Sequence, residues 1–190
     1  MNRSKSSGFT LIEIAVVLVI IGLLLGGVMK GKTLIENAKV SSEASRIDRI
    51  NVGINLFFDR YQRYPGDGCN DNICSNNGVG TKDGNIFGGN ENEAGWYELI
   101  EKTGILTKKD RTSVFGQNWN FFNIGNDTWL DLPGGDQADA SWFCQLDKNR
   151  DDGNWNTGQI RHFSGGNRYD FNTDCWSLTG KINAVIQLDF

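Results

Sequence analysis

The sequence predicts an α+β protein in which one long N-terminal helix packs on a small antiparallel sheet. Three observations predict this class: an apolar stretch at the start, a helical stripe of apolar residues after it, and short apolar segments separated by Gly, Asn and Asp beyond residue 65. The chain has 24 glycines and only 2 prolines, so its C-terminal part should be rich in turns. We therefore expect a helix with a transmembrane half and an amphipathic half, followed by loop-rich, disulfide-linked segments.

The apolar stretch runs from Phe9 to Met29, and its 21 residues would measure about 31 Å as a helix, which matches the hydrocarbon core of a bilayer. From Ile14 onward every residue is apolar or Gly, and one acid, Glu13, lies near the start. Arg3 and Lys5 precede the stretch, which favours a cytoplasmic N-terminus and a periplasmic C-terminal part. The stretch therefore predicts a single membrane span.

Three interpretations of this stretch compete. A secretory signal peptide is disfavoured, because no Ala-x-Ala site follows and a signal h-region usually has only about 7–15 residues. A plain signal anchor leaves Glu13 unexplained, because an acid in mid-bilayer costs about 2.5–3.5 kcal/mol on insertion scales. The third interpretation gives a role to every feature of residues 8–13, Gly-Phe-Thr-Leu-Ile-Glu.

Residues 8–13 resemble the processing and assembly motif of the type IV pilin and type II secretion pseudopilin family. The resemblance implies that prepilin peptidase removes the leader, residues 1–8, by cutting between Gly8 and Phe9, and that the new amine of Phe9 is N-methylated. It also implies that Glu13 pairs with the amine of a neighbouring subunit. The implied partners are other pilin or pseudopilin subunits and an inner-membrane assembly platform.

The resemblance implies a structural subunit of a helical type IV pilus or a type II secretion pseudopilus, not an enzyme, and leaves the choice of machine open. The alternative is a membrane-anchored periplasmic binding module or adhesin whose helix serves only as an anchor. The formal net charge of −4 gives no reason to expect a nucleic-acid partner. No catalytic motif surrounds His162, the only histidine, so we expect no catalytic residues.

Apolar residues continue at helical spacing after the span, and Pro65-Gly66 follows them as a helix-ending signal. We therefore expect one helix from near Phe9 to about Tyr64. Four segments follow: a leader (1–8), a transmembrane or filament-core helix (9–29), its amphipathic continuation (30–64) and a globular periplasmic or extracellular domain (65–190). The stripe consists of Val40, Ala44, Ile47, Ile50, Ile54, Phe57, Tyr61 and Tyr64.

The globular segment predicts a short helix over 93–103 that turns Trp96, Leu99 and Ile100 inward and ends at Gly104. Strands are expected at 119–124, 128–132, 141–146, 159–163 and 182–189. The six tryptophans are expected to fill a small core, and a sugar-binding surface is the alternative.

Four cysteines, Cys69, Cys74, Cys144 and Cys175, suit an oxidising compartment, and they allow three disulfide pairings. We favour Cys69–Cys74, which closes a short loop, together with Cys144–Cys175. Zinc is the rival interpretation, but the spacings are not paired C-x-x-C and no second histidine is present.

A polar cluster places oxygen ligands at Asp147, Asn149, Asp151 and Asp152, as in a calcium loop. It is not an EF-hand, because the places that need Gly and Glu hold Asp152 and Gly158. Some pseudopilins bind calcium in a C-terminal loop, although their ligands do not match this loop residue by residue. Calcium and a loop closed by Asx-turn hydrogen bonds both remain open, and no other cofactor is expected.

Overall fold

The computed structural model describes residues 9–68, 86, 89–124, 127–133, 137–163 and 168–189. The chain forms two compact units, Met1–Ala38 and Lys39–Phe190, which we call the N-terminal unit and the head unit. The first helix, α1 (Leu11–Tyr61), begins in the N-terminal unit and ends in the head unit. Each unit is described by itself below.

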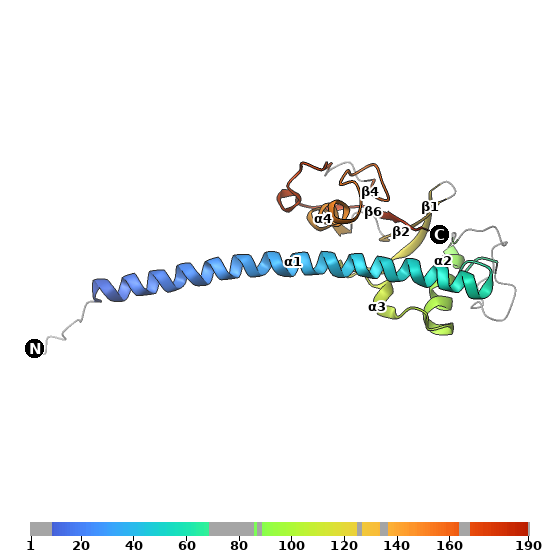
Figure 1. Ribbon diagram of the computed structural model, residues 1–190, viewed down its shortest axis with the longest axis horizontal. Helices are drawn as coiled ribbons and strands as arrows, with labels where there is room; N and C mark the ends of the chain where they lie inside the picture. The colour runs from blue at the N-terminus through green and yellow to red at the C-terminus, as the bar shows by residue number, and fades with distance from the viewer. Residues whose placement is uncertain are drawn as a thin grey trace, which may run out of the picture. The chain divides into compact units, whose positions relative to one another are not determined.

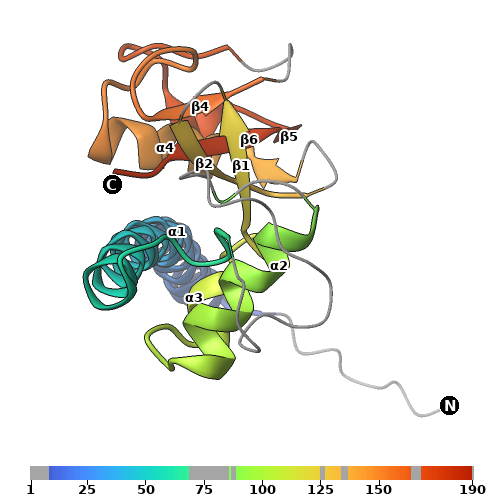
Figure 2. The same ribbon diagram turned by 90° about the vertical axis from the view of Figure 1, so that its right-hand side faces the viewer.

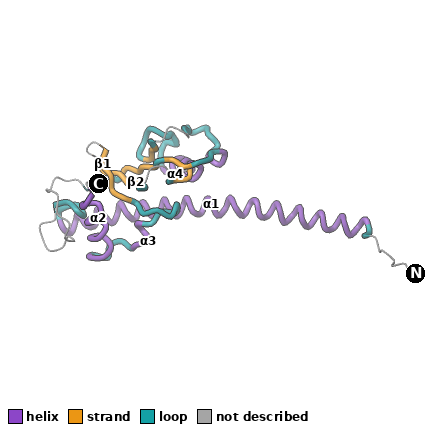
Figure 3. Tube along the Cα trace, turned by 180° about the vertical axis from the view of Figure 1, so that it is seen from behind, coloured by secondary structure: helices purple, strands orange, loops and turns teal. Residues whose placement is uncertain are grey.

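In the N-terminal unit, α1 is an uninterrupted helix (Figures 1 and 3). The glycines of this part, including Gly22 and Gly26, do not break it, and Lys30 and Gly31 continue the helix. Every large apolar side chain from Ile14 to Met29 is 46–75% exposed. This segment therefore presents apolar surface around its whole circumference.

In the head unit, α1 buries most of the predicted apolar stripe, with Val40, Ile47, Ile50, Ile54 and Phe57 all at most 3% exposed, whereas Tyr61 at the end of the helix is 46% exposed. The helix ends at Tyr61 and not at Tyr64, because Gln62 takes a left-handed backbone with φ of 54°. A left-handed residue directly after a helix is a common way to end it, and here it acts before Pro65.

The strands form two antiparallel sheets. The larger has the order β1-β2-β6-β4 and the smaller pairs β3 with β5. In the larger sheet Phe121 pairs with Leu130, and Leu130 pairs with Ile186, so apolar side chains line up across three strands. The strands are β1 (Asn120–Ile124), β2 (Asp127–Asp131), β3 (Ala138–Asp139), β4 (Ile160–His162), β5 (Lys181–Ile182) and β6 (Ala184–Gln187).

One predicted strand is wrong, because residues 141–146 belong to the helix α4 (Ala140–Arg150). Phe143 and Leu146 are three residues apart and both buried, which is helical spacing. The predicted strand 182–189 is divided, because Ile182 pairs with β3 while Ala184–Gln187 pairs with β2 and β4. The other predicted strands are confirmed with small shifts of their bounds.

The predicted helix at 93–103 is α2 (Gly89–Tyr97), which continues as a π-helical turn, η1 (Glu98–Lys102). Gly104 follows with φ of 63°, which fits its predicted role as a cap. The short helices α3 (Lys108–Arg111) and η2 (Cys175–Ser177, a 3₁₀ turn) complete the fold. Figure 2 shows the strands on one side of the head part of α1, and it shows α2 and α3 together on another side.

One hydrophobic core joins α1, η1 and the sheet, and it includes Phe57, Leu99, Leu130 and Ile186. Three tryptophans, Trp96, Trp119 and Trp129, are at most 2% exposed, as the core interpretation predicts. The other three are half-buried, and Trp142 and Trp176 pack against the main core while Trp155 packs against a second cluster around the Cys144–Cys175 pair.

Candidate functional site

The first turn of α1 forms a hydrogen-bonded cap around the only acid of the apolar stretch. Glu13 Oε2 accepts hydrogen bonds from the backbone N–H of Thr10 at 2.7 Å and from its hydroxyl at 2.8 Å. The backbone N–H of Glu13 donates to Thr10 Oγ1 at 3.4 Å. This reciprocal arrangement is a capping box, which satisfies N–H groups that the first helical turn leaves without partners.

The cap occupies only one oxygen of Glu13. Among the described residues, Oε1 of Glu13 accepts no hydrogen bond. Phe9, which precedes the cap, is 84% exposed. The site therefore holds a carboxylate oxygen that can accept a further donor or pair with a cation from outside the subunit.

The sequence analysis identified Phe9 and Glu13 but missed Thr10. A Thr followed by Glu three residues later, before an apolar run, is the sequence signal for a capping box, and it was present at Thr10 and Glu13. Gly8, the residue expected before the cut, lies outside the described residues.

The surface around this site is an apolar helix, and α1 is long and apolar enough to cross a membrane, with a window of mean hydropathy 2.8. A methyl group added at Gly22, Gly26 or Gly27 would meet nothing within 4 Å. Small residues on such a helix let neighbouring helices approach closely. The N-terminal unit therefore carries the features of a helix that packs in lipid or among other helices.

Glu43 and Glu98 are buried acids of the head unit, and both oxygens of each accept hydrogen bonds. Glu43, on α1, accepts from Trp119 Nε1 at 2.6 Å, and its other oxygen accepts from Arg46 at 2.7 Å and from the backbone N–H of Val114 at 2.9 Å. Burial raises the pKa of Glu43 above its ordinary value, and the bond from Trp119 and the charge of Arg46 oppose that rise.

Glu98, on η1, forms a bidentate pair with Arg63 at 2.5 and 2.8 Å and also accepts from the backbone N–H of Gly66 at 2.8 Å. Both partners follow directly on the end of α1. This buried pair therefore fixes the chain after the helix against the π-turn.

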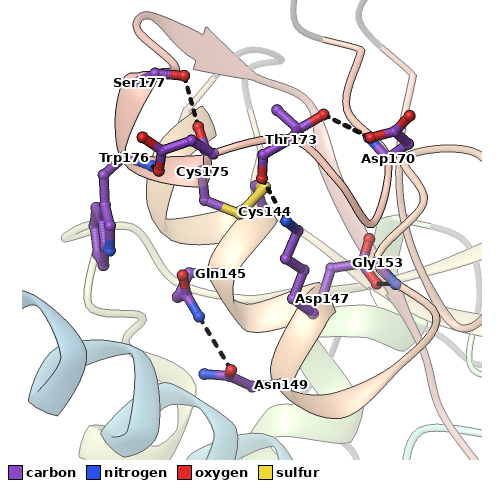
Figure 4. The surroundings of a disulfide bond; sticks show 12 residues. Cys144, Gln145, Asp147, Asn149, Gly153, Asp170, Thr173, Cys175, Trp176 and Ser177 are labelled. Atoms are coloured by element: carbon purple, nitrogen blue, oxygen red, sulfur yellow. Dashed lines mark hydrogen bonds between the residues drawn. A yellow bond between two sulfur atoms is a disulfide. The ribbon is translucent and has the colours of Figure 1, made fainter.

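The disulfide Cys144–Cys175 is present and joins α4 to η2, with an S–S distance of 2.02 Å and a Cα–Cα distance of 5.5 Å. Figure 4 shows the bond between the two cysteines. Asp174 caps η2, because its side chain accepts from the backbone N–H of Trp176 at 3.1 Å. This half of the predicted pairing is confirmed. Cys69 and Cys74 lie outside the described residues, so their pairing stays a prediction.

The predicted calcium residues follow α4. One ligand oxygen from each of Asp147, Asp151 and Asp152 lies within 4.8 Å of the others. Asn149 is different, because its side-chain oxygen accepts from Gln145 at 3.1 Å, and Figure 4 shows it turned toward that residue. The structure therefore gathers the three acids into one cluster.

Turn hydrogen bonds already engage two of these acids. Asp151 accepts from the backbone N–H groups of Gln159 and Ile160, at 2.5 and 2.8 Å, and Asp152 accepts from Asn154 and Thr157. Asp147 is fully buried and accepts from the N–H of Gly153 at 3.0 Å. Burial raises the pKa of Asp147 to about 7, although Tyr169 and Gly153 act against the rise. The expected Asx-turn chemistry is therefore present.

His162 shows no catalytic arrangement among the described residues. It is 1% exposed, and its ring packs against the rings of Trp155 and Tyr169.

A comparison with family models finds a match at the segment that contains this site. The family model described as the prokaryotic N-terminal methylation motif matches residues 3–29, which include the capped Glu13. The match is confined to the N-terminal part of the chain and identifies this motif there.

Among solved structures, the chain is similar to the major type IV pilin PilA1 from Clostridium difficile. The sequence identity is 13%, the match covers 82% of this chain and 98% of that pilin, and the TM-score is 0.46. No curated protein matches the chain.

Proposed function

We propose that this pilin-like protein is inserted in the bacterial inner membrane, with its N-terminus cytoplasmic and its head periplasmic, and assembles into a helical type IV pilus or type II secretion pseudopilus. The exposed apolar circumference of α1 supports the proposal, because such a helix can leave the lipid bilayer only if other apolar surfaces cover it. A bundle of copies of the same helix provides those surfaces. Head-to-tail contacts that do not close into a ring then generate a filament.

The observation that carries the proposal is the half-occupied carboxylate of Glu13. Prepilin peptidase would cut between Gly8 and Phe9, and the positive amine of Phe9, after N-methylation, would pair with Glu13 of the neighbouring subunit. The free Oε1 supports this step, because the subunit's own cap leaves that atom available. Desolvation offsets much of the attraction in such a pair, so its main effect is on the register of neighbouring subunits. A subunit that retains residues 1–8 would not offer this amine.

The first experiment determines the N-terminus of mature protein from cells that carry the native assembly machinery. Peptide mass spectrometry should find N-methylated Phe9 as the first residue. An intact Met1, or a cut after residue 25, would contradict the processing step.

A matched pair of variants separates charge from capping at the first turn. Glu13→Gln keeps an oxygen that can accept from Thr10 but removes the charge, whereas Thr10→Ala removes the hydroxyl of the cap and keeps the charge. If pairing with an amine is what matters, Glu13→Gln should be processed normally and yield few or no filaments, while Thr10→Ala retains most assembly. Normal filaments from Glu13→Gln would refute the pairing.

The alternative function is a membrane-anchored binding module whose helix serves only as an anchor. It predicts that Glu13→Gln has no effect on any activity of the head and that the protein stays in the membrane fraction. Recovery of the protein in sheared surface fibres or in a periplasmic pseudopilus would exclude this alternative. The same fractionation distinguishes the two filament types from each other.

We also propose that the Asp147, Asp151 and Asp152 cluster binds calcium in the assembled head. Three hard oxygen donors in one place fit Ca²⁺, and Asn149, the fourth predicted ligand, accepts from Gln145 through its side-chain oxygen. Calcium should raise the melting temperature of the wild-type protein, and Asp151→Asn should abolish that shift while keeping an acceptor oxygen. Asp170→Asn is the matched control, because Asp170 also accepts turn hydrogen bonds but is not one of the three clustered acids. No shift between calcium and chelator would leave only the turn interpretation.

A further inference from the structure

An open cleft lies on the head unit between the α2–η1 segment and α3, two elements that Figure 2 shows side by side. Its volume is about 390 Å³, within the range of about 300–1,000 Å³ that is typical of small-molecule sites. Every residue that lines it belongs to the described part of the chain. No function considered above uses this cleft.

The wall of the cleft contains the π-helical turn η1. Two of its residues, Ile100 and Glu101, line the cleft together with Tyr97, the last residue of α2. A π-turn is a rare departure from the α-helix and occurs frequently at functional sites. Here the turn also places Glu98 and Leu99 in the core at 0% exposure, so its inner face is fixed while its outer face borders the cleft.

The charged groups of the cleft are paired with one another. Arg111 forms a bidentate pair with Glu93, with one of the two bonds at 3.0 Å, and Lys108 lies 2.9 Å from Glu101. Arg111 lowers the pKa of Glu93, and Glu101 raises the pKa of Lys108, so each pair favours the charged form of Glu93 and of Lys108. The cleft therefore carries no excess charge that would select an anion or a cation.

The cleft also offers neutral polar and apolar surface. Tyr97 is 41% exposed and Ile100 is partly buried beside it. Asn118 accepts from the hydroxyl of Thr112 at 2.9 Å, which leaves its amide N–H₂ group without a hydrogen bond among the described residues. Trp96 closes the floor, stacked on Phe121 with ring centroids 4.5 Å apart.

We propose that this cleft binds a neutral saccharide. A sugar hydroxyl both donates and accepts, so it can donate to Glu93 or Glu101 and accept from Arg111, Lys108 or Asn118 without breaking either ion pair. The apolar face of a sugar ring would pack on Tyr97 and Ile100. A net anion or cation would instead have to displace an existing charged partner, which leaves that partner uncompensated.

This inference does not depend on filament assembly, because the cleft lies wholly within the head unit. The test uses the full chain in lauryldimethylamine oxide, a detergent without a sugar headgroup. The probes are the methyl glycosides of glucose, galactose, mannose and N-acetylglucosamine, with alanine as a zwitterionic comparison. Saturation-transfer-difference NMR should show ring protons of at least one glycoside in contact with the wild-type protein.

Two variants locate the contact. Tyr97→Ala removes the aromatic surface and Glu101→Gln removes a charged acceptor, and each should weaken binding of that glycoside by about tenfold or more. Tyr61→Ala is the matched control, because Tyr61 is similarly exposed at 46% but does not line this cleft. The melting temperature of each variant shows whether it is folded.

The outcomes separate clearly. Loss of the signal in folded Tyr97→Ala or Glu101→Gln, with the signal kept in Tyr61→Ala, supports the saccharide site. If no glycoside receives saturation from the wild-type protein, if alanine alone binds, or if both cleft variants bind as tightly as wild type, the proposal is wrong.

Discussion

Two glutamates on the same helix show how the two units differ. Glu43, in the head unit, is 1% exposed, and both of its oxygens accept hydrogen bonds from Arg46, Val114 and Trp119. Glu13, in the N-terminal unit, lies on an exposed apolar helix, and within the described part of the chain only one of its oxygens accepts hydrogen bonds, both from groups of Thr10. Groups of the same head unit therefore occupy both oxygens of Glu43, whereas Glu13 keeps one oxygen available for a group from outside its subunit.

This difference separates a structural role from an assembly role. A buried acid with every oxygen occupied stabilises the arrangement of the groups around it, and its loss is felt as a loss of stability. An acid with a free oxygen on an apolar surface contributes little to the stability of its own subunit, and its loss should instead impair pairing with a neighbouring subunit. If the two kinds of acid differ in this way, changes to them should differ in their effect on the free energy of unfolding or the melting temperature of the full chain in detergent.

The largest effect is expected for Glu98→Ala in the head unit. This change leaves the buried guanidinium of Arg63 without its bidentate partner, and breaking such a pair typically costs about 3–5 kcal/mol. Denaturant unfolding should show this loss. Glu13→Ala, in contrast, should change the free energy of unfolding of the head by less than about 0.5 kcal/mol. Equal losses in the two variants would contradict the division between the units.

Replacing both Cys144 and Cys175 with alanine should have the next largest effect. The bond joins residues 31 positions apart, and for a loop of that size the chain-entropy relation gives a stabilisation of about 3.7 kcal/mol. The melting temperature of the head should fall in the double variant, and reduction of the wild-type protein should reproduce the fall. A wild-type melting temperature that is insensitive to reductant would show that the bond contributes little.

Glu43→Gln should cost about 1–3 kcal/mol, because an amide cannot accept all three hydrogen bonds and a buried donor is left without a partner. Its effect should also depend on pH. The folded state raises the pKa of Glu43 above 4.5, so the folded state binds the proton more tightly than the unfolded state. The contribution of this group is greatest below its ordinary pKa and falls as pH rises through the raised pKa.

The measurement is the difference in melting temperature between wild type and Glu43→Gln from pH 4 to pH 8. We expect the advantage of wild type to shrink as the pH rises through this range. A difference that grows with pH would show that the ionised form is the one that the fold favours.

A smaller and sharper contrast comes from two glycines of α1. A methyl group at Gly53 would lie 2.8 Å from the side chain of Leu106, whereas at Gly26 it would meet nothing within 4 Å. Overpacking of this kind typically costs about 1–3 kcal/mol, so Gly53→Ala should lower the melting temperature of the head and Gly26→Ala should not. An unchanged melting temperature for Gly53→Ala would mean that Leu106 moves aside at little cost.

Much of the fold could be predicted because its signals are local. The helical spacing of Val40, Ile47, Ile54 and Phe57 predicts one buried face of a long helix, and the structure confirms it. The Cys144–Cys175 bond was chosen from three possible pairings and is present. The end of α1 was placed at Tyr64 because Pro65 was read as the stop, and the left-handed Gln62 that ends it earlier carries no comparable sequence signal.

The parts that were not predicted include one local pattern that was misinterpreted and one contact between residues distant in sequence. The segment 141–146 was read as a strand, although Phe143 and Leu146 have helical spacing and the disulfide ties the resulting helix to η2. The buried pair of Arg63 with Glu98 joins residues 35 positions apart, and neither residue carries a motif. At the candidate site, the importance of Glu13 was predicted from a sequence motif. Only the structure shows that its Oε1 accepts no hydrogen bond among the described residues.

The central claim is that Glu13 of one subunit meets the amine of Phe9 of the next. Purified filaments assembled from a mixture of ¹⁴N- and ¹⁵N-labelled subunits, treated with a membrane-permeant carbodiimide, test it most directly, because this reagent joins a carboxylate to an amine only where the two are in contact. We expect mass spectrometry to find Phe9–Glu13 linked peptides of mixed isotope composition. Filaments in which Lys32 and Glu36, 3.7 Å apart within one helix, become linked while Phe9 and Glu13 do not would contradict the claim.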